Sequence, residues 1–431
     1  MSTDLCIYQI TGNPDTYNEV NFIIDNCKYK YKLSGEALLK HYNYNKIIIL
    51  RPQSIKEDEK SLINKLIVEH QDKAEVLDIH AIGKYGNEKY ISNVTNISLQ
   101  LFIHMLKKAE EIICDISTGY NIYTYALMEA ARFFATFKKL INNKQDNKQK
   151  LITRFAISEP VSKPNQQDPY NIFVEELRTH AFFSFPFTKN DINQFKLTSY
   201  LDTNDRNIKQ YVGKNYKKSC QNIKKAIKNA LKAYNAIRYN TPLVFQDLLK
   251  LDSESDISDL IKELNKFCNS IFSETKSKND QIYSLMLKRD IYNLYLALAI
   301  YCLIIKNVNI KVESLDDLKQ FIKIYNELGF DINSRFLERE IKEIEYYQGR
   351  IGNEEKYLDV IFRNNGCQNQ HNQKTNNKHN KKGDIKRNFF AHAGFERTLV
   401  KVKRDNDKII IKYDENEENR KKICDWLYDP S

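Results

Sequence analysis

The chain has 431 residues, of which 42% are hydrophobic, enough for a core in each of two or three domains. Its longest apolar run, residues 294–305, is shorter than the ~20 residues that cross a bilayer, and no apolar leader begins the chain. We therefore expect a soluble, cytoplasmic protein without a membrane partner. The eight cysteines form no Cys-x-x-Cys pair, which disfavours a zinc site or a redox motif.

Short apolar, β-branched runs recur through the first part of the chain and alternate with helical patterns. The runs are CIYQI (6–10), KIIIL (46–50), AEVLDIHAI (74–82), EIICDI (111–116) and LITRFAI (151–157). Strands that alternate with helices predict a parallel, doubly wound sheet, because right-handed crossovers place helices on both faces. The N-terminal part is therefore predicted to be an α/β domain.

Three of these strands run into loops of small, polar and glycine residues. The loops are TGNP (11–14), RPQS (51–54) and STGYN (117–121). Such loops open on one edge of a parallel sheet, where ligands bind. Gly12 and Gly119 would let a ligand approach the backbone, and the hydroxyls of Ser117 and Thr118 beside a helix starting near Asn121 would suit phosphate oxygens. No dinucleotide or Walker glycine motif is present, and simple turns are the alternative explanation.

The second half of the chain has a helical period from about residue 205 onward. Within it, residues 206–238 include ten Lys or Arg and no acidic residue, so this segment would attract polyanions. A solvated helix face is the alternative. Three lysines are candidate RNA contacts: Lys217, Lys224 and Lys228.

These patterns predict an α/β sensor domain over residues 1–190, a basic helical linker over 191–240 and a helical domain over 241–431. Residues 363–384 are rich in Asn, Gln and Lys and predict a mobile loop. The spacing of Cys367, His371 and His379 in that loop matches no zinc finger, so no metal site is predicted. Residues 398–413 alternate around an Asp-Asn-Asp turn and predict a β-hairpin.

The segment RNFFAHAGFER, near the C-terminus, carries Arg387 and His392 five positions apart in an apolar, helical setting. Asp384 is predicted as the N-cap of this helix and Gly394 as its end, and Asn388 shares a face with His392. Imidazole titrates near neutrality, and guanidinium can donate two hydrogen bonds to phosphate oxygens. The set therefore suits metal-independent cleavage of RNA by its own 2′-hydroxyl; a core histidine paired with a carbonyl is the alternative.

RNFFAH resembles the R-x4-H motif of HEPN ribonucleases, and DISTGYN (115–121) at a strand end resembles the CARF domain. Together they resemble the CARF–HEPN ribonucleases that accompany type III CRISPR systems, over essentially the whole chain. The resemblance implies a Rossmann-like sensor that binds cyclic oligoadenylate across a dimer interface and a helical effector that degrades RNA in antiviral defence. It also implies that Arg387 and His392 are catalytic, with Asn388 assisting, in a site that two protomers share.

The resemblance and the loop positions imply a set of contacts to cyclic oligoadenylate. These residues are Thr11, Gly12, Asn13, Ser34, Arg51, Ser54, Ser117, Thr118, Gly119 and Asn121. The fourth-strand motif has Ser-Thr-Gly where many relatives have Thr-His-Gly, which argues against cleavage of the ring by the sensor itself.

The sequence therefore predicts a single-stranded RNA endonuclease that cyclic oligoadenylate, expected to be the tetra-adenylate, activates. No cofactor other than this allosteric activator is expected. A symmetric homodimer is expected, because a two-fold ring suits a two-fold interface, and a higher oligomer is the alternative. A non-catalytic nucleotide sensor and a constitutive HEPN toxin ribonuclease are the alternatives, whereas a metabolic Rossmann enzyme is disfavoured by the missing glycine fingerprint.

Overall fold

The computed structural model describes residues 5–11, 18–55, 69, 73–117, 121–142, 152–159, 169–177, 184–308, 310, 312–363 and 381–430. The chain forms two compact units. Unit 1 comprises Met1–Ser184, Lys196–Cys220 and Ile261–Tyr295, and unit 2 comprises Phe185–Phe195, Gln221–Leu260 and Leu296–Ser431. None of the helices in the described ranges combines the length and apolarity needed to cross a membrane.

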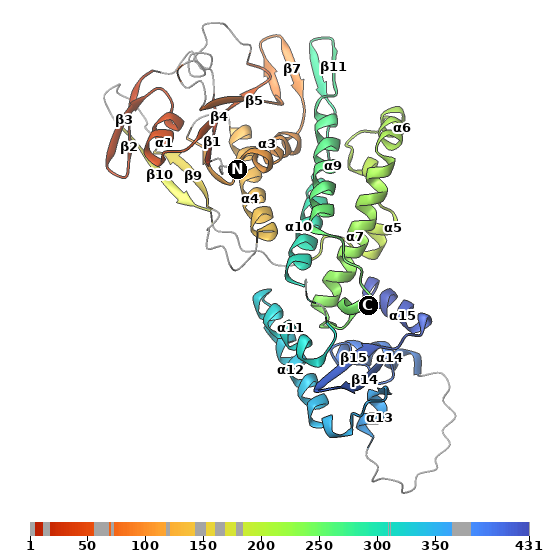
Figure 1. Cartoon of the computed structure of the whole chain (residues 1–431). Coiled ribbons are helices and arrows are strands. Elements are labelled where there is room, and N and C mark those ends of the chain that lie inside the picture. The colour runs from red at the N-terminus through yellow and green to blue at the C-terminus, as the bar shows by residue number, and fades with distance from the viewer. Residues whose placement is uncertain are drawn as a thin grey trace. The chain divides into compact units, whose positions relative to one another are not determined.

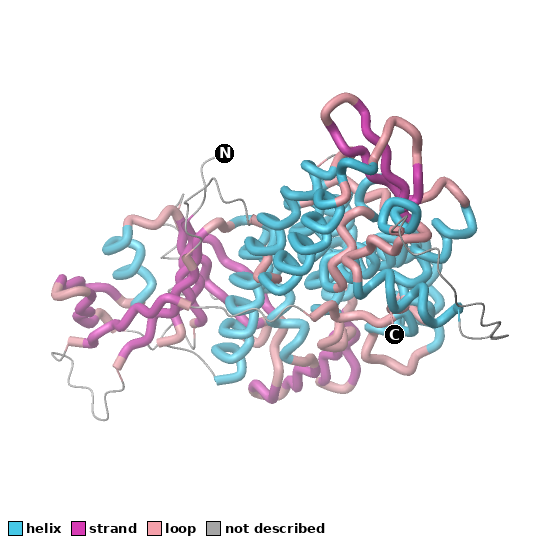
Figure 2. The backbone as a smooth tube through the Cα atoms, turned by 90° about the horizontal axis from the view of Figure 1, so that it is seen from below, coloured by secondary structure: helices cyan, strands magenta, loops and turns pink. Residues whose placement is uncertain are grey.

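Unit 1 contains an eight-stranded sheet in the order β3-β2-β10-β9-β8-β1-β4-β5. Figure 1 labels most of these strands, and Figure 2 shows strands in magenta. Its strands are β1 (Leu5–Ile10), β2 (Val20–Ile24), β3 (Cys27–Tyr31), β4 (Lys46–Pro52), β5 (Ala74–Ile79), β8 (Glu111–Asp115), β9 (Thr153–Ser158) and β10 (Tyr170–Glu176). The five neighbours from β9 to β5 pair in parallel. The predicted parallel sheet is therefore confirmed, with an extension through β10, β2 and β3 that the apolar runs did not indicate.

Helices cover both faces of this sheet, as a doubly wound fold requires (Figure 1). Ile7 of β1 and Ile47 of β4 share a buried cluster with Ala37 and Leu38 of α1 (Ser34–Tyr42). On the other face, the hydroxyl of Tyr8 lies 3.1 Å from Nδ1 of a histidine in α3 (Val94–Lys108). Successive strand residues point to opposite faces, which explains why these buried strands read as continuous apolar runs.

The helices α3 and α4 (Asn121–Ile141) pack against each other, and aromatic rings from both contact Tyr292 and Tyr295 at the start of α10 (Ile291–Asn307). Asn93 caps α3 by accepting a hydrogen bond from the backbone N–H of Asn96 at 2.8 Å. The ring of Phe102 then packs edge-to-face on Phe133 at 4.7 Å and on Tyr295 at 5.1 Å between centroids. Aromatic edge-to-face contacts of this kind hold the first residues of α10, 291–295, in unit 1.

A second sheet of four strands, in the order β11-β12-β7-β6, also belongs to unit 1. Its strands are β6 (Gly83–Tyr85), β7 (Glu88–Ile91), β11 (Thr275–Lys278) and β12 (Gln281–Ser284). The hairpin of β11 and β12 interrupts a region that the sequence predicts to be helical. Its turn residues, Asn279 and Asp280, have φ angles of 51° and 58°, which is the left-handed pair that a tight hairpin turn needs.

Unit 2 is mainly helical and includes a small sheet near the C-terminus. Its helices and helical parts come from α5 (Lys189–Asn193), α7 (Lys217–Arg238), α8 (Val244–Asp247), α9 (Glu254–Phe272), α10, α11 (Leu315–Glu327), α12 (Asp331–Tyr346), α13 (Leu358–Phe362), α14 (Lys381–Ala391) and α15 (Glu417–Tyr428). The strands β14 (Val400–Asp405) and β15 (Lys408–Tyr413) pair antiparallel, which confirms the predicted hairpin. The short β13 (Lys356–Tyr357) pairs with β14.

The boundaries between the units fall inside three helices, because α7, α9 and α10 each contribute residues to both. The basic stretch forms α6 (Arg206–Asn215) and α7. Most of the segment predicted as a mobile loop, residues 364–380 with Cys367, His371 and His379, lies outside the described residues.

Candidate functional site

The R-x4-H motif lies at the C-terminal end of α14. Arg387 and Asn388 are exposed on the helix, whereas His392 is the first residue after it and is partly buried. The backbone N–H of His392 donates to the carbonyl of Asn388 at 3.0 Å, so the two side chains are one helical turn apart. The helix begins at Lys381, before Asp384, so the predicted N-cap at Asp384 is wrong.

A tight turn fixes the backbone directly after His392. Ala393 and Gly394 both have left-handed φ angles, 52° and 80°, and the N–H of Gly394 donates to the carbonyl of Phe389 at 2.8 Å. This pattern closes a helix C-terminus and satisfies a carbonyl that the helix leaves unpaired. The hydroxyl of Tyr413 in β15 donates to the carbonyl of Gly394 at 3.1 Å. The turn therefore holds the backbone of His392 at a defined place beside the hairpin. It also agrees with the prediction that the helix ends before Gly394.

His392 contacts an acidic residue from α12. Its Nδ1 lies 3.2 Å from Oε1 of Glu340. The Glu340 side chain is 12% exposed and that of His392 is 37% exposed, so the carboxylate is shielded while part of the imidazole reaches solvent. Burial raises the pKa of Glu340, and the contact with His392 opposes that rise. Neither spacing nor composition singled out Glu340, which is one of several acidic residues on the same helix.

A second ion pair joins α12 to the segment after the motif. Nη2 of Arg397 lies 2.9 Å from Oε1 of Glu343, and both side chains are partly exposed. The guanidinium of Arg397 also lies over the ring of Phe362, at 4.8 Å from its centroid. The side chain of Arg387, by contrast, makes no hydrogen bond or ion pair with any residue in the described ranges.

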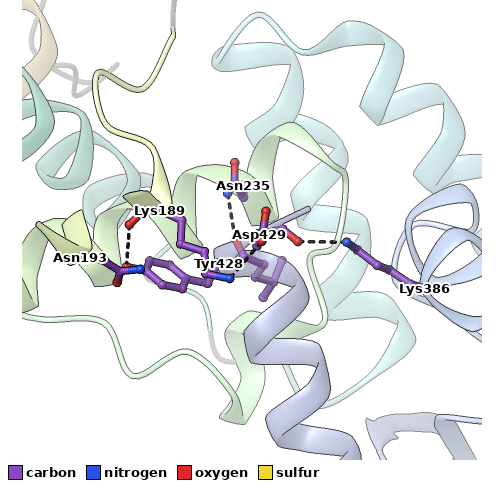
Figure 3. Close-up of polar contacts among 7 residues, drawn as sticks. Lys189, Asn193, Asn235, Lys386, Tyr428 and Asp429 are labelled. Atoms are coloured by element: carbon purple, nitrogen blue, oxygen red, sulfur yellow. Dashed lines mark hydrogen bonds and ion pairs between the residues drawn. The ribbon is translucent and has the colours of Figure 1, made fainter. Parts of the chain in front are cut away.

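Residues at the C-terminal end of α15 contact α14 through Lys386 (Figure 3). Nζ of Lys386, the residue before Arg387, donates to the carbonyl of Asp429 at 3.0 Å, and the Asp429 carboxylate pairs with Lys189 at 3.0 Å. The side chain of Asn235 donates to the carbonyl of Leu427 at 2.8 Å. One face of α14 is thereby tied to α5 and α7 through the last residues of α15.

Two predicted RNA contacts take part in this same region. Nζ of Lys224 donates to the carbonyl of Asn193 at 2.9 Å, and Nζ of Lys228 lies 5.0 Å from the ring centroid of Tyr428. Lys217 is exposed at the first position of α7. The side chains of Lys217 and Lys228 are exposed, whereas that of Lys224 has a structural partner.

In unit 1, the ends of β1, β4 and β8 lie at one edge of the sheet, because these strands pair in parallel. Of the predicted ligand contacts there, Gly12, Asn13, Thr118 and Gly119 lie outside the described residues. The remaining six are described: Thr11, Ser34, Arg51, Ser54, Ser117 and Asn121. Asn121 is exposed at the first turn of α4.

A buried polar network supports this edge. Asp115, at the end of β8 and fully buried, accepts a hydrogen bond from the hydroxyl of Ser34 at 2.5 Å and one from the backbone N–H of Ser117 at 3.0 Å. The side chain of Gln9 donates to the Ser34 hydroxyl at 2.9 Å and accepts from the N–H of Gly35 at 3.1 Å. Burial raises the pKa of the Asp115 carboxyl, and the hydrogen bonds from Ser34 and Ser117 oppose that rise.

Other predicted contacts at the edge have partners within the protein. Arg51, at the end of β4, forms a two-pronged ion pair with Asp78, with N–O distances of 2.7 and 3.1 Å. The hydroxyl of Ser117 accepts a hydrogen bond from the backbone N–H of Ser158 at 2.9 Å. Thr11 is fully buried. Asp115 therefore brings Ser34 and Ser117 together, whereas the guanidinium of Arg51 is paired with the carboxylate of Asp78.

Among the described residues, no group of three or more His, Cys, Asp or Glu side chains is arranged to hold a metal ion.

Comparison with known proteins gives matches to two domain models of one family. The CARF domain of the CRISPR system endoribonuclease Csx1 matches residues 6–160, and the HEPN domain of the same endoribonuclease matches residues 330–417. Among solved structures, Enterococcus italicus Csm6 bound to cyclic hexa-2′-fluoro-hexa-dAMP matches at 11% identity and a TM-score of 0.23, over 81% of this chain and 86% of that chain. No curated protein matches the chain.

The two domain matches together cover more than half of the chain, and they occur in the order that the sequence predicts. The CARF match spans the parallel sheet from β1 to β9, and the HEPN match spans α12, α14 and the C-terminal hairpin. Both the motif histidine and its Glu340 partner lie inside the HEPN match. The chain therefore belongs to the CARF–HEPN ribonucleases of CRISPR systems that these two models describe.

Proposed function

We propose that this protein cleaves single-stranded RNA without a metal ion and that cyclic oligoadenylate switches this activity on during type III CRISPR defence in the cytoplasm. The observation that carries the proposal is the placement of Arg387, Asn388 and partly exposed His392 at one end of α14, within the HEPN match. These are the residue types that phosphodiester cleavage by a 2′-hydroxyl requires.

In the proposed reaction the ribose 2′-oxygen attacks the neighbouring phosphorus, and the bond from phosphorus to the 5′-oxygen breaks. The products are a 2′,3′-cyclic phosphate and a 5′-hydroxyl. His392 takes the proton of the 2′-hydroxyl, and His392 of the partner subunit returns a proton to the 5′-oxygen. Arg387 donates to the non-bridging phosphate oxygens as their charge grows, and Asn388 orients one of them.

The activator would bind at the edge formed by the ends of β1, β4 and β8, across the two-fold axis of a homodimer. The ring that we propose is cyclic tetra-adenylate. The contacts proposed for it are those that the sequence predicts, with Asn121 and the backbone around Ser117 facing the ring. Ser34 would support the site indirectly, because its hydroxyl is buried and donates to Asp115. An activating ring must bind better to the dimer whose two motifs are correctly placed.

The test is cleavage of a fluorescent single-stranded RNA in EDTA, with and without cyclic tetra- or hexa-adenylate, for the parent protein and His392→Ala. We expect cleavage that requires one of the rings and is lost in His392→Ala, with a cyclic phosphate at the new 3′ end. Equal cleavage without a ring would support a constitutive ribonuclease, and cleavage that survives in His392→Ala would remove the motif from the chemistry. Light scattering during chromatography tests the dimer.

A further inference from the structure

The contact between His392 and Glu340 has a geometry that constrains the chemistry of the imidazole. Glu340 projects from α12 beside the buried Leu337, Ile341 and Ile344, so a packed helix fixes where its carboxylate lies. The backbone of His392 is fixed as well, since its N–H donates to Asn388 and its carbonyl accepts from the N–H of Phe395 at 2.7 Å. Two independently anchored elements therefore bring these side chains together.

A charged carboxylate can only accept a hydrogen bond, so Glu340 requires the proton of a neutral imidazole to be on Nδ1. The lone pair is then on Nε2, the ring nitrogen that Glu340 does not contact. With 37% of the side chain exposed, the imidazole remains open to a ligand. The carboxylate also stabilises the positive imidazolium that forms when Nε2 takes up a proton.

We propose that Glu340 is a positioning residue for the ribonuclease reaction: it selects the His392 tautomer that presents Nε2 to RNA and stabilises the ring once it is protonated. This inference rests on the proposed function of the motif, and it adds a residue that lies 52 positions away in the sequence.

The alternative is that the contact serves only to join α12 to the segment after α14. The pair of Glu343 and Arg397 provides the matched comparison, because it joins the same two segments one helical turn further along α12 and does not involve His392. Both acidic residues can be changed to glutamine with the same loss of one charge. A purely structural role predicts similar consequences for the two changes.

The experiment measures kcat, KM and the pH–rate profile of activated RNA cleavage for the parent, Glu340→Gln, Glu340→Asp and Glu343→Gln. We expect Glu340→Gln to lower kcat on the order of 10- to 100-fold with little change in KM, as supporting partners of active-site histidines do. Its pH–rate profile should also differ from that of the parent, because position 340 no longer carries a titrating carboxyl. Glu340→Asp should restore part of kcat, and Glu343→Gln should remain within about twofold of the parent.

The charged neighbours of Glu340 enter the interpretation of that profile. Glu343 raises the pKa of Glu340 and Arg339 lowers it, and His392, on the facing segment, also lowers it. Arg397 acts on Glu343 through their ion pair. Equal kcat losses in Glu340→Gln and Glu343→Gln, with unshifted limbs in both, would overturn the positioning role.

A second measurement does not depend on cleavage. The tautomer of His392 can be read from its ring ¹⁵N shifts by NMR, with His392→Ala used for assignment. We expect Nδ1–H in the parent and a mixture of tautomers in Glu340→Gln. A mixture already present in the parent would refute the inference even if the RNA is cleaved. A fixed Nδ1–H tautomer in a protein that cleaves no RNA would instead count against the proposed function alone.

Discussion

The side chain of Arg387 is exposed and makes no hydrogen bond or ion pair with a described residue, so its contribution should be to chemistry rather than to folding. Arg387→Lys keeps the charge and loses the planar fork that can bind two phosphate oxygens. We expect kcat for activated RNA cleavage to fall by about 10²- to 10³-fold, with the free energy of unfolding changed by less than ~0.5 kcal/mol.

The control for Arg387→Lys is Arg404→Lys. Arg404 donates to the carbonyls of Ile351 and Gln348, at 3.2 and 2.9 Å, and so has a structural role. It should give the opposite pattern, with lower stability and unchanged kcat. If Arg387→Lys also lowers stability while kcat is preserved, Arg387 is not the phosphate contact.

Asp115 makes a pH-dependent contribution to folding, because burial raises the pKa of its carboxyl above the unfolded value. The folded protein then keeps this proton to a higher pH than the unfolded chain does. The stability from this group is fully present below the unfolded pKa and is lost as pH rises through the folded pKa, by ~1.4 kcal/mol for each unit of difference.

Asp115→Asn removes this titration. The stability deficit of Asp115→Asn relative to the parent should therefore be largest at acid pH and shrink toward neutrality. Urea unfolding followed by circular dichroism, at several pH values where both proteins fold, measures that difference. A deficit that stays constant or grows with pH would show that the carboxyl is not held at a raised pKa.

At the scale of structural elements, the turn after α14 depends on a glycine. Gly394 has φ of 80°, and a Cβ there would lie 2.9 Å from the hydroxyl of Tyr413 and 3.2 Å from Cβ of Thr241. Gly394→Ala should lower the free energy of unfolding by about 1–3 kcal/mol, since it adds both strain and a close contact. It should also reduce RNA cleavage by displacing His392.

Two other glycines separate the causes of the Gly394→Ala effect. Gly329 has φ of 78° with open space around its Cβ position, so Gly329→Ala tests strain alone. Gly349 has neither a left-handed φ nor a close neighbour, so Gly349→Ala should be nearly neutral. Thermal melting of the three variants gives the comparison; an unaffected Gly394→Ala would mean that the turn can move.

The elements that the sequence predicts well are those whose signal is local. The central strands β1, β4 and β8 are apolar on both faces, because helices cover both sides of the sheet, and so they stand out as continuous runs. The sequence does not predict the hairpin of β11 and β12, because every residue of β11 is exposed, which leaves no alternating apolar pattern. Its Asn279-Asp280 turn was the available signal.

The residues of the candidate site also differ in whether their signal is local in the sequence or arises only from tertiary packing. Arg387, Asn388 and His392 are close in sequence, and their spacing and residue types are the signal from which the sequence predicts a site. Glu340 contacts His392 only through the tertiary packing of α12, and no property of the sequence distinguishes it from Glu338 or Glu343 on that helix. The burial of Ser34, at the start of α1, also depends on tertiary structure, because its partner Asp115 lies 81 positions away at the end of β8.

At the scale of the whole molecule, the net charge of +11 and the basic helix α7 predict salt-dependent RNA binding. Lys217→Glu and Lys228→Glu should each weaken binding and make the slope of log K against log salt shallower by ~1. Fluorescence anisotropy with His392→Ala as the background avoids cleavage. Lys30→Glu, on the edge strand β3, is the control for net charge. Equal slopes for all these proteins would exclude α7 from the RNA path.

The pairing of β7 with β12 has a consequence for how the protein is made. β7 and its partner are separated by almost two hundred residues, so at ~5–20 residues per second the ribosome needs roughly 10–40 s to deliver β12 after β7. During that time β7 presents an open edge, and the side chain of Asn96 lacks the Leu285 carbonyl and Leu287 N–H that it later binds. A nascent chain stalled before β12 would therefore carry an incomplete unit 1 that is prone to pair with other strands.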